Sequence, residues 1–461
     1  MMLFKPLLGF IKFNVKGNNS VGDSVHYFLI IPDVITNINF KSNKKEKVIQ
    51  KAYLCISDMT KHHKAYKYRI YPTKTQEVML AKMFGCSRFV WNHYLNKNQQ
   101  HYLANKEKQE QGRMKGYLSY FDNAKNLTDL KKEEDKKFLL EANSQSLQTT
   151  LKHLDSSYKR FFNKTSGFPS YKKKNGKQSF TIPQNVKISG NKVKMPKFGG
   201  GIKIVIDREM TGRIITVVVS KNPSGKYFIS LLTEEEIQSF PENKKAVGID
   251  LGITSFAYLS DGKEIKNIKS LKRVEKKLKI AQKHLSRKKK GSKNKEKARI
   301  KVARLHEKIS NRRTDFLHKT SKKIVDENQI ICLESLNVKN MMKNHKLAKA
   351  IGDCSWSTFV NQIEYKAKWY GRTVVSIDRF FPSSKVCSEC GYKNDKLTLK
   401  DREWTCSGCG IIHIRDWNAA KNILKQGLNS LSLGTNDYRC GEEISPSQEG
   451  KHLVETSNSS D

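Results

Sequence analysis

Three short hydrophobic runs, far apart in the sequence, each lead into an acidic residue, and this pattern constrains the fold more than any other feature. Runs of four or so aliphatic residues are typical of buried strands. The acids at their ends are Asp250, Glu334 and Asp416. Acidic residues at strand ends can converge on divalent metals, and carboxylate oxygens are the hard ligands that Mg²⁺ prefers. The pattern therefore predicts a two-metal site able to hydrolyse a phosphodiester.

Each acid also has an ordinary alternative when it is taken alone. Asp250 could be a turn or helix-cap residue, Asp416 could cap a helix, and Glu334 could be paired with a Lys or Arg. Gly248 and Gly252 flank Asp250. Because glycine has no side chain, we expect these two positions to let a phosphate backbone approach closely.

Two Cys-x2-Cys pairs lie between the second and third acids. They are Cys387, Cys390, Cys406 and Cys409, with fifteen residues between the pairs. A redox pair is the alternative, but two matched pairs at this spacing predict one tetrahedral zinc ion. Four protein ligands leave no open position, so the zinc is expected to be structural. The nearby His413 either lies near the acids or is a packed, hydrogen-bonded structural residue.

The charge of the chain indicates a polyanionic partner. The 461 residues include 87 Lys and Arg against 44 Asp and Glu, a formal net charge of +43. Nucleic acid is the commonest counterpart of such an excess. A membrane partner is not expected, because no apolar run of about 18 residues is present. The nine cysteines do not form an even set of pairs, which favours a reducing compartment over an oxidising one. The expected location is the cytoplasm, on the nucleoid if the host is bacterial.

The length and the periodicity predict a multidomain protein of α+β and α/β type. Strand patterns occur over 66–71 and 180–232, and the first could join the others in one β-domain with a helical block, 76–163, inserted. A basic helical hairpin is predicted over 268–328. Its like charges favour nucleic-acid contact over a solvated face. Aromatic residues near Tyr66 and Trp91 are interleaved with basic residues. They could stack on nucleobases or belong to the core.

The acids and cysteines stand inside longer motifs. These are residues 64–76, 85–92, 248–252, 333–336, 381–391 and 416–423. In this order they resemble the TnpB (OrfB) family of transposon-encoded RNA-guided nucleases, which are relatives of the type V CRISPR effectors. The resemblance covers most of residues 61–426. Two departures are Ile414, where the family often has an acid, and the first 58 residues, which have no counterpart.

The resemblance implies a domain plan. The chain would contain a β-barrel wedge domain (59–75 and 175–240), an inserted helical recognition domain (76–174), a split RuvC-like, RNase H-type nuclease domain (244–380 and 413–427), a zinc ribbon (381–412) and a disordered tail (428–461). Residues 1–58 are either an accessory extension or lie upstream of a true start at Met59.

The resemblance also implies an activity. Asp250, Glu334 and Asp416 would bind two catalytic Mg²⁺ ions, and the four cysteines one Zn²⁺. The partners would be a guide RNA from the transposon end and double-stranded target DNA, and the protein would read a short flanking motif. The sequence does not determine the oligomeric state, for which a monomer is favoured. The alternatives are an inactive homologue acting as a guided repressor, a strand-joining transposase, and an unguided RuvC-type nuclease acting on branched DNA.

Overall fold

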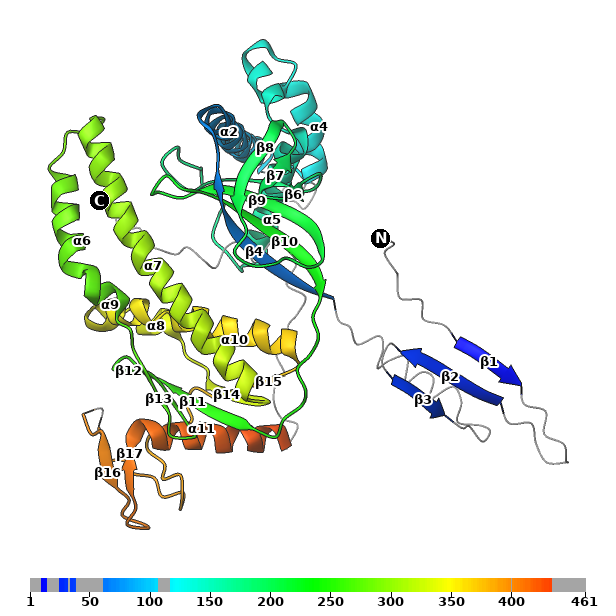
Figure 1. Cartoon of the computed structure of the whole chain (residues 1–461). Coiled ribbons are helices and arrows are strands. Elements are labelled where there is room, and N and C mark those ends of the chain that lie inside the picture. Colours follow the sequence, from blue (N-terminus) through cyan, green and yellow to red (C-terminus); the bar gives the residue numbers. More distant parts are fainter. Residues whose placement is uncertain are drawn as a thin grey trace. The chain divides into compact units, whose positions relative to one another are not determined.

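The structure is a computed structural model (Figure 1). It describes residues 10–14, 25–31, 34–38, 61–106, 117–398 and 400–432, with the backbone alone in the first three ranges. The chain divides into two compact units, Met1–Lys61 and His62–Asp461. The first unit contains an antiparallel sheet in the order β1-β2-β3, formed by β1 (Phe10–Asn14), β2 (Val25–Ile31) and β3 (Val34–Ile38). The sequence showed no periodicity there.

In the second unit, a seven-stranded sheet has the order β5-β9-β10-β4-β8-β7-β6. Its strands are β4 (Lys61–Tyr71), β5 (Gln178–Ile182), β6 (Lys187–Ser189), β7 (Lys192–Met195), β8 (Phe198–Val205), β9 (Arg213–Lys221) and β10 (Tyr227–Glu236). The early strand β4 pairs with β8, so it joins the later strands as expected. The described pairings do not join β5 to β6, and a closed barrel stays a prediction.

The helical block lies between β4 and β5 in the chain. It consists of α2 (Lys74–Ala104), α4 (Tyr120–Leu130), a 3₁₀ segment (Glu134–Glu141) and α5 (Ser144–Phe162). Thr73 and Gln76 form a reciprocal capping box at the start of α2. Tyr66 and Trp91 are buried, so both belong to the core.

A second sheet, of five strands, has the order β13-β12-β11-β14-β15. The strands are β11 (Ala246–Leu251), β12 (Ser255–Leu259), β13 (Glu264–Lys266), β14 (Ile330–Glu334) and β15 (Thr373–Ile377). β11, β14 and β15 run parallel, and β12 pairs with β11 in the antiparallel sense. The carboxyl ends of the three parallel strands therefore meet at one edge of this sheet.

Helices cover both faces of the five-stranded sheet. The helices of this part of the chain are α6 (Ser270–Ser286), α7 (Lys293–Glu327), α8 (Val338–Met341), α9 (His345–Cys354), α10 (Trp356–Tyr370) and α11 (Arg415–Ser432). Of these, α6 packs on α7 and not on the sheet. On one face, Ile249 and Leu333 pack in a core with Leu317 of α7 and Phe359 of α10. On the other face, Cys332 packs with Ile423 of α11. The basic helical hairpin, formed by α6 and α7, matches its predicted position.

The ribbon hairpin consists of β16 (Glu403–Thr405) and β17 (Ile412–Ile414). The boundary predicted at residue 427 is wrong, because α11 continues to Ser432, and Leu431 packs against the core that contains Ile423. The rest of the tail, 433–461, lies outside the described residues. Among the described helices, none combines the length and the apolar character that a bilayer span requires.

Candidate active site and metal centre

The register of two parallel strands brings Asp250 and Glu334 together. Ile249 of β11 lies opposite Leu333 of β14, so the next residue on each strand is an acid at the same sheet edge. Neighbouring strands lie about 4.8 Å apart. Because side chains alternate between the faces of a strand, Asp250 and Glu334 share a face with Gly248 and Cys332 respectively.

That shared face is the one covered by α11. A Cβ atom built on Gly248 would stand 2.6 Å from the amide nitrogen of Leu424, and one built on Gly427 would stand 2.9 Å from Cβ of Cys332. Strands β11 and β14 therefore both lie directly beneath α11. Both carboxylates are directed to the side of the sheet on which the third acid lies.

Asp416 lies in the first turn of α11. Trp417 anchors this turn by donating from its indole Nε1 to the carbonyl oxygen of Ser260, at 3.1 Å. The Asp416 carboxylate contacts Nη1 of Arg402 at 3.3 Å and Nε of Arg415 at 3.4 Å. Of the three acids, Asp416 is thus the one held by cations in the described part of the chain.

Burial shifts the ionisation of the other two acids, and the charges of the neighbouring acids add to the shift of Asp250. Burial, together with the neighbouring charges of Glu334 and Asp416, raises the pKa of Asp250 to about 8, while the positive charge of Arg415 acts in the opposite direction. Burial also raises the pKa of Glu334, while a hydrogen bond from Ser383 acts in the opposite direction. A pair of carboxylates that repel each other at one edge is stabilised by a divalent cation between them.

The ordinary alternatives for Glu334 and Asp416 do not hold. Helix α11 begins at Arg415, so the residue before it is Ile414, and Asp416 does not occupy the cap position. Glu334 has no ion pair with Lys or Arg among the residues that the structure describes. Its hydrogen-bond donor is the neutral hydroxyl of Ser383.

Asp353, at the end of α9, shows what a structural acid looks like in the same unit. Its Oδ1 accepts from Nη2 of Arg313 at 2.9 Å, and its Oδ2 accepts from the amide of Leu271 at 3.0 Å. Both carboxylate oxygens are therefore satisfied. Asp250 has neither an ion pair nor a side-chain hydrogen bond within the described ranges, which is unusual for a half-buried carboxylate.

The interpretation of Gly248 as a point of phosphate approach is wrong. The space where its side chain would lie is filled by the backbone of α11, so glycine is required there for helix packing. Gly252 is also constrained, in this case by the backbone of its own turn, because a Cβ atom at this position would stand 2.8 Å from the carbonyl oxygen of Ser255. The two glycines shape the sheet and the turn after β11.

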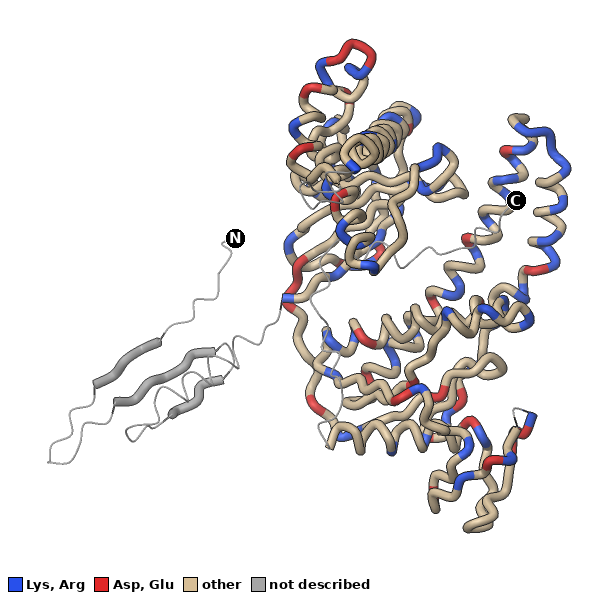
Figure 2. The backbone as a smooth tube through the Cα atoms, turned by 180° about the vertical axis from the view of Figure 1, so that it is seen from behind, with Lys and Arg blue, Asp and Glu red and all other residues tan. Residues whose placement is uncertain are grey.

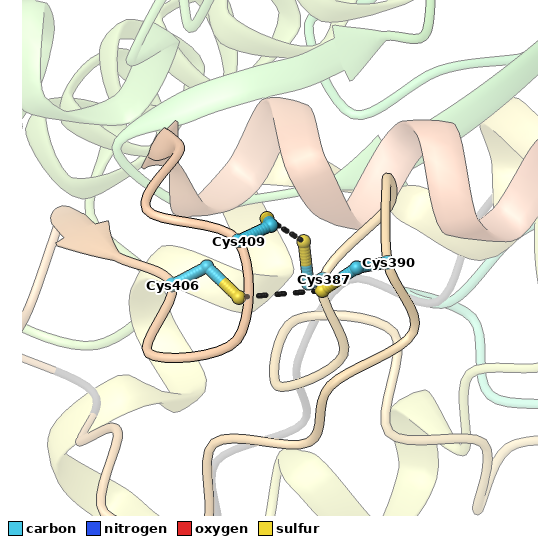
Figure 3. A group of neighbouring side chains, drawn as sticks. All are labelled: Cys387, Cys390, Cys406 and Cys409. Atoms are coloured by element: carbon cyan, nitrogen blue, oxygen red, sulfur yellow. Dashed lines mark hydrogen bonds between the residues drawn. The ribbon is translucent and has the colours of Figure 1, made fainter.

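The four cysteines of the ribbon gather as the spacing predicted (Figure 3). Their sulfur atoms all lie within 4.8 Å of one another, with 3.7 Å between Cys387 and Cys409 and 3.5 Å between Cys390 and Cys406. Zn–S bonds of about 2.3 Å in a tetrahedron require sulfurs about 3.8 Å apart, so the cluster fits a metal such as zinc. No member forms a disulfide.

The knuckle glycines and His413 complete the ribbon. Gly391 and Gly410 have φ values of +78° and +73°, as expected for these turns. His413 is buried, with Nε2 3.0 Å from Sγ of Cys387 and its ring against Trp404. It is therefore the packed, hydrogen-bonded histidine of the two alternatives, and it lies at the cysteine cluster.

Several residues around these centres were not predicted from the sequence. Ser383 donates to Glu334, Arg402 contacts Asp416, and Asn418 and Asn422 of α11 bind the segment that enters the ribbon. The two asparagines stand four residues apart, which places them on one helix face. That spacing is the one signal that could have revealed them.

The basic hairpin of α6 and α7 carries Lys and Arg along both helices (Figure 2). Its connection to the seven-stranded sheet is specific: Glu307 of α7 accepts from Nδ2 of Asn222 at 2.9 Å and pairs with Lys226 at 3.0 Å. The acids on these helices are too few to neutralise the bases. The hairpin is therefore a strongly positive surface held against the β-domain.

Three family models match the chain in succession. Residues 59–107 match a "Helix-turn-helix domain" of the OrfB_IS605 type, 229–345 match OrfB_IS605, described as "Probable transposase", and 356–423 match the "Cas12f1-like, TNB domain". The second model spans Asp250 and Glu334, and the third spans the four cysteines and Asp416. Over the first, the structure contains one strand and one helix.

Full-length relatives extend these matches. A protein of Streptomyces pristinaespiralis named "Putative RNA-guided DNA endonuclease" is 42% identical, over 86% of this chain and 95% of its own length. InsQ of Escherichia coli (strain K12), whose name carries the same description, is 33% identical over 81% and 94%. A solved Cas12f1–sgRNA–target DNA complex aligns with a TM-score of 0.49 and 13% identity, over 79% of this chain and 98% of that chain. The chain belongs to the TnpB (OrfB) family.

Proposed function

We propose that the protein is an RNA-guided, Mg²⁺-dependent DNA endonuclease of a mobile element, with Asp250, Glu334 and Asp416 as its catalytic acids. One observation carries this proposal. Two neighbouring carboxylates, Asp250 and Glu334, share a sheet edge and form no ion pair in the described part of the chain, beside a third acid on α11. Such an arrangement is costly unless a ligand compensates it.

In this proposal, the five-stranded sheet and α11 form the RuvC-like nuclease domain. Two Mg²⁺ ions bound there would activate a water for attack on phosphorus and stabilise the leaving oxygen. Asp250 and Glu334 contribute carboxylates fixed by β11 and β14, and Asp416 contributes one fixed by α11. Arg402, with a half-exposed side chain, adds positive charge at the edge where a phosphate enters.

The four cysteines hold one structural Zn²⁺ in this proposal, because the cluster offers four thiolates and no open position. The α6–α7 hairpin grips the guide–target duplex by charge, and base pairing with the guide selects the target. The names of the relatives support an RNA guide and a DNA target. The protein acts as a monomer in the cytoplasm, on the nucleoid if the host is bacterial.

The test is plasmid cleavage by the full chain purified together with RNA from its own transposon end. A supercoiled plasmid with a guide-matched target and flanking motif should be linearised in Mg²⁺. The same preparation should lose activity after RNase treatment. Target binding without cleavage would instead support the guided-repressor alternative, and cleavage that survives RNase treatment would support an unguided nuclease.

A further inference from the structure

A continuous chain of buried and partly buried hydrogen bonds runs from α11 through the entry segment of the ribbon to Glu334. At the Glu334 end, the hydroxyl of Ser383 donates to Oε1 at 2.6 Å. Ser383 is 6% exposed, so this bond is largely shielded from water on the serine side. A serine hydroxyl has one hydrogen to donate, and the carboxylate receives it.

Two asparagines of α11 hold the segment that carries Ser383. Nδ2 of Asn422 donates to the carbonyl oxygens of Ser383, at 2.8 Å, and Val386, at 2.6 Å. Nδ2 of Asn418 also donates to Val386, at 2.7 Å, and its Oδ1 accepts from the amide of Ser388 at 2.9 Å. Asn418 and Asn422 are 2% and 3% exposed, so little water can replace these bonds.

We propose that Ser383 is a positioning residue that orients Glu334 for metal binding, and that Asn422 sets Ser383 in place. This inference rests on the proposed function of the acidic site. The bond from Ser383 occupies one direction at Oε1 and fixes the carboxylate plane, which leaves Oε2 free for a cation. Residues that hold a metal ligand in this way commonly change metal affinity tenfold or more when they are removed.

The same segment links the two metal centres. Val386, which accepts from both asparagines, immediately precedes Cys387, and Ser383 lies four residues before that cysteine. The first knuckle and the orientation of Glu334 therefore depend on one short stretch of backbone fixed to α11. The fold of the ribbon is coupled to the acidic site through this segment.

The experiment measures Mn²⁺ binding to the full chain freed of nucleic acid, by electron paramagnetic resonance of the free ion. Mn²⁺ serves as the probe for Mg²⁺. Five variants are compared with the wild type: Ser383→Ala, Asn422→Leu, the double variant that combines these two, Asp250→Ala and Ser388→Ala. Ser388 is the matched control, because its side chain contacts Glu389 and its bond to Asn418 uses the backbone amide. Zinc content and melting temperature are recorded for each variant.

We expect Ser383→Ala to weaken Mn²⁺ binding about tenfold with zinc content unchanged. Asn422→Leu should weaken Mn²⁺ binding by a similar factor. The double variant should bind Mn²⁺ about as tightly as either single variant, because both changes disturb the same hydrogen-bond chain. Ser388→Ala should bind Mn²⁺ as the wild type does. The Mg²⁺ concentration for half-maximal cleavage should rise in parallel for Ser383→Ala.

Three results would overturn the inference in different ways. If Asp250→Ala removes an Mn²⁺ site while Ser383→Ala and Asn422→Leu bind as the wild type does, the positioning role is wrong and the proposed function stands. If Asp250→Ala leaves Mn²⁺ binding intact, the acidic site itself is wrong. A lower melting temperature with unchanged Mn²⁺ affinity would mean that these residues are structural.

Discussion

Gly248 of β11 lies against the backbone of α11 at Leu424, where an added Cβ atom would stand 2.6 Å from the amide nitrogen. This contact sets the distance between the sheet that carries Asp250 and Glu334 and the helix that carries Asp416. No rotation of a side chain can relieve the clash, because the obstructing atoms belong to the helix backbone. The missing side chain of Gly248 is therefore what permits the three acids to approach.

A Gly248→Ala substitution should displace α11 and separate Asp416 from the other acids. Overpacking of this kind costs about 1–3 kcal/mol of unfolding free energy, and sometimes more. We expect a lower melting temperature. We also expect the activation free energy of cleavage to rise by at least as much as the unfolding free energy falls. Gly199→Ala is the control, because a Cβ atom there meets nothing within 4 Å. Wild-type cleavage by Gly248→Ala would contradict this account of the packing.

Stability in Mg²⁺-free buffer should depend on the ionisation of Asp250. Its pKa is raised to about 8 by burial and by Glu334 and Asp416, from an ordinary value near 4. Between these two values the folded state keeps a proton that the unfolded state releases, so stability falls as pH rises.

Asp250→Asn removes that titration without changing the shape of the side chain. The melting temperature of the variant, relative to the wild type, should therefore increase from pH 5 to pH 8 and level off above about pH 8. Mg²⁺ should narrow the difference by stabilising the wild type. A difference that does not change with pH would show that Asp250 ionises normally in the folded protein.

Loss of one ribbon thiol should release the metal. Cys390→Ser removes an exposed member of the cluster, so we expect about one zinc per chain to be lost and the melting temperature to fall. Elemental analysis of the purified chain measures the zinc directly. Cys440→Ser, outside the two knuckles, should keep the metal. Full zinc content in Cys390→Ser would exclude a four-cysteine site.

The turn between α6 and α7 offers a direct test of the positive surface. Replacing Lys288, Lys289 and Lys290 with Gln should weaken RNA and DNA binding across all sequences. The slope of log affinity against log salt should fall by about 0.7–0.9 for each phosphate that these lysines neutralise in the wild type. Replacing Lys132 and Lys137, which pair with Asp129 and Glu134, is the matched control. An unchanged slope would mean that the turn does not bind nucleic acid.

The strands, the helical hairpin and the cysteine cluster could be predicted because local patterns encode them. The hydrophobic runs before Asp250 and Glu334 are strands, and the spacing of the cysteines brings their sulfurs together. Contacts between segments that are distant in the sequence leave no comparable local pattern from which they could be predicted. The role of Gly248 depends on a helix about 170 residues further along the chain.

The partners of the acids were equally hidden. Ser383 reaches Glu334 because α11 fixes the ribbon entry, and a serine within a polar segment has no periodicity to reveal this. The nuclease domain was predicted to end at residue 427 because the polar composition after it suggested a tail, whereas α11 continues to Ser432 and Leu431 packs on the core. Each of these errors concerns packing between segments distant in the sequence.

Single-turnover cleavage by the Asp250→Ala complex tests the central claim most directly. The complex, purified with its RNA, is given a linear duplex that carries the guide-matched target and the flanking motif, in Mg²⁺. We predict that RNA and target binding match the wild type while strand cleavage falls to the background of the RNA-free protein. Cleavage at the wild-type rate by this variant would contradict the assignment of Asp250, Glu334 and Asp416 as the active site.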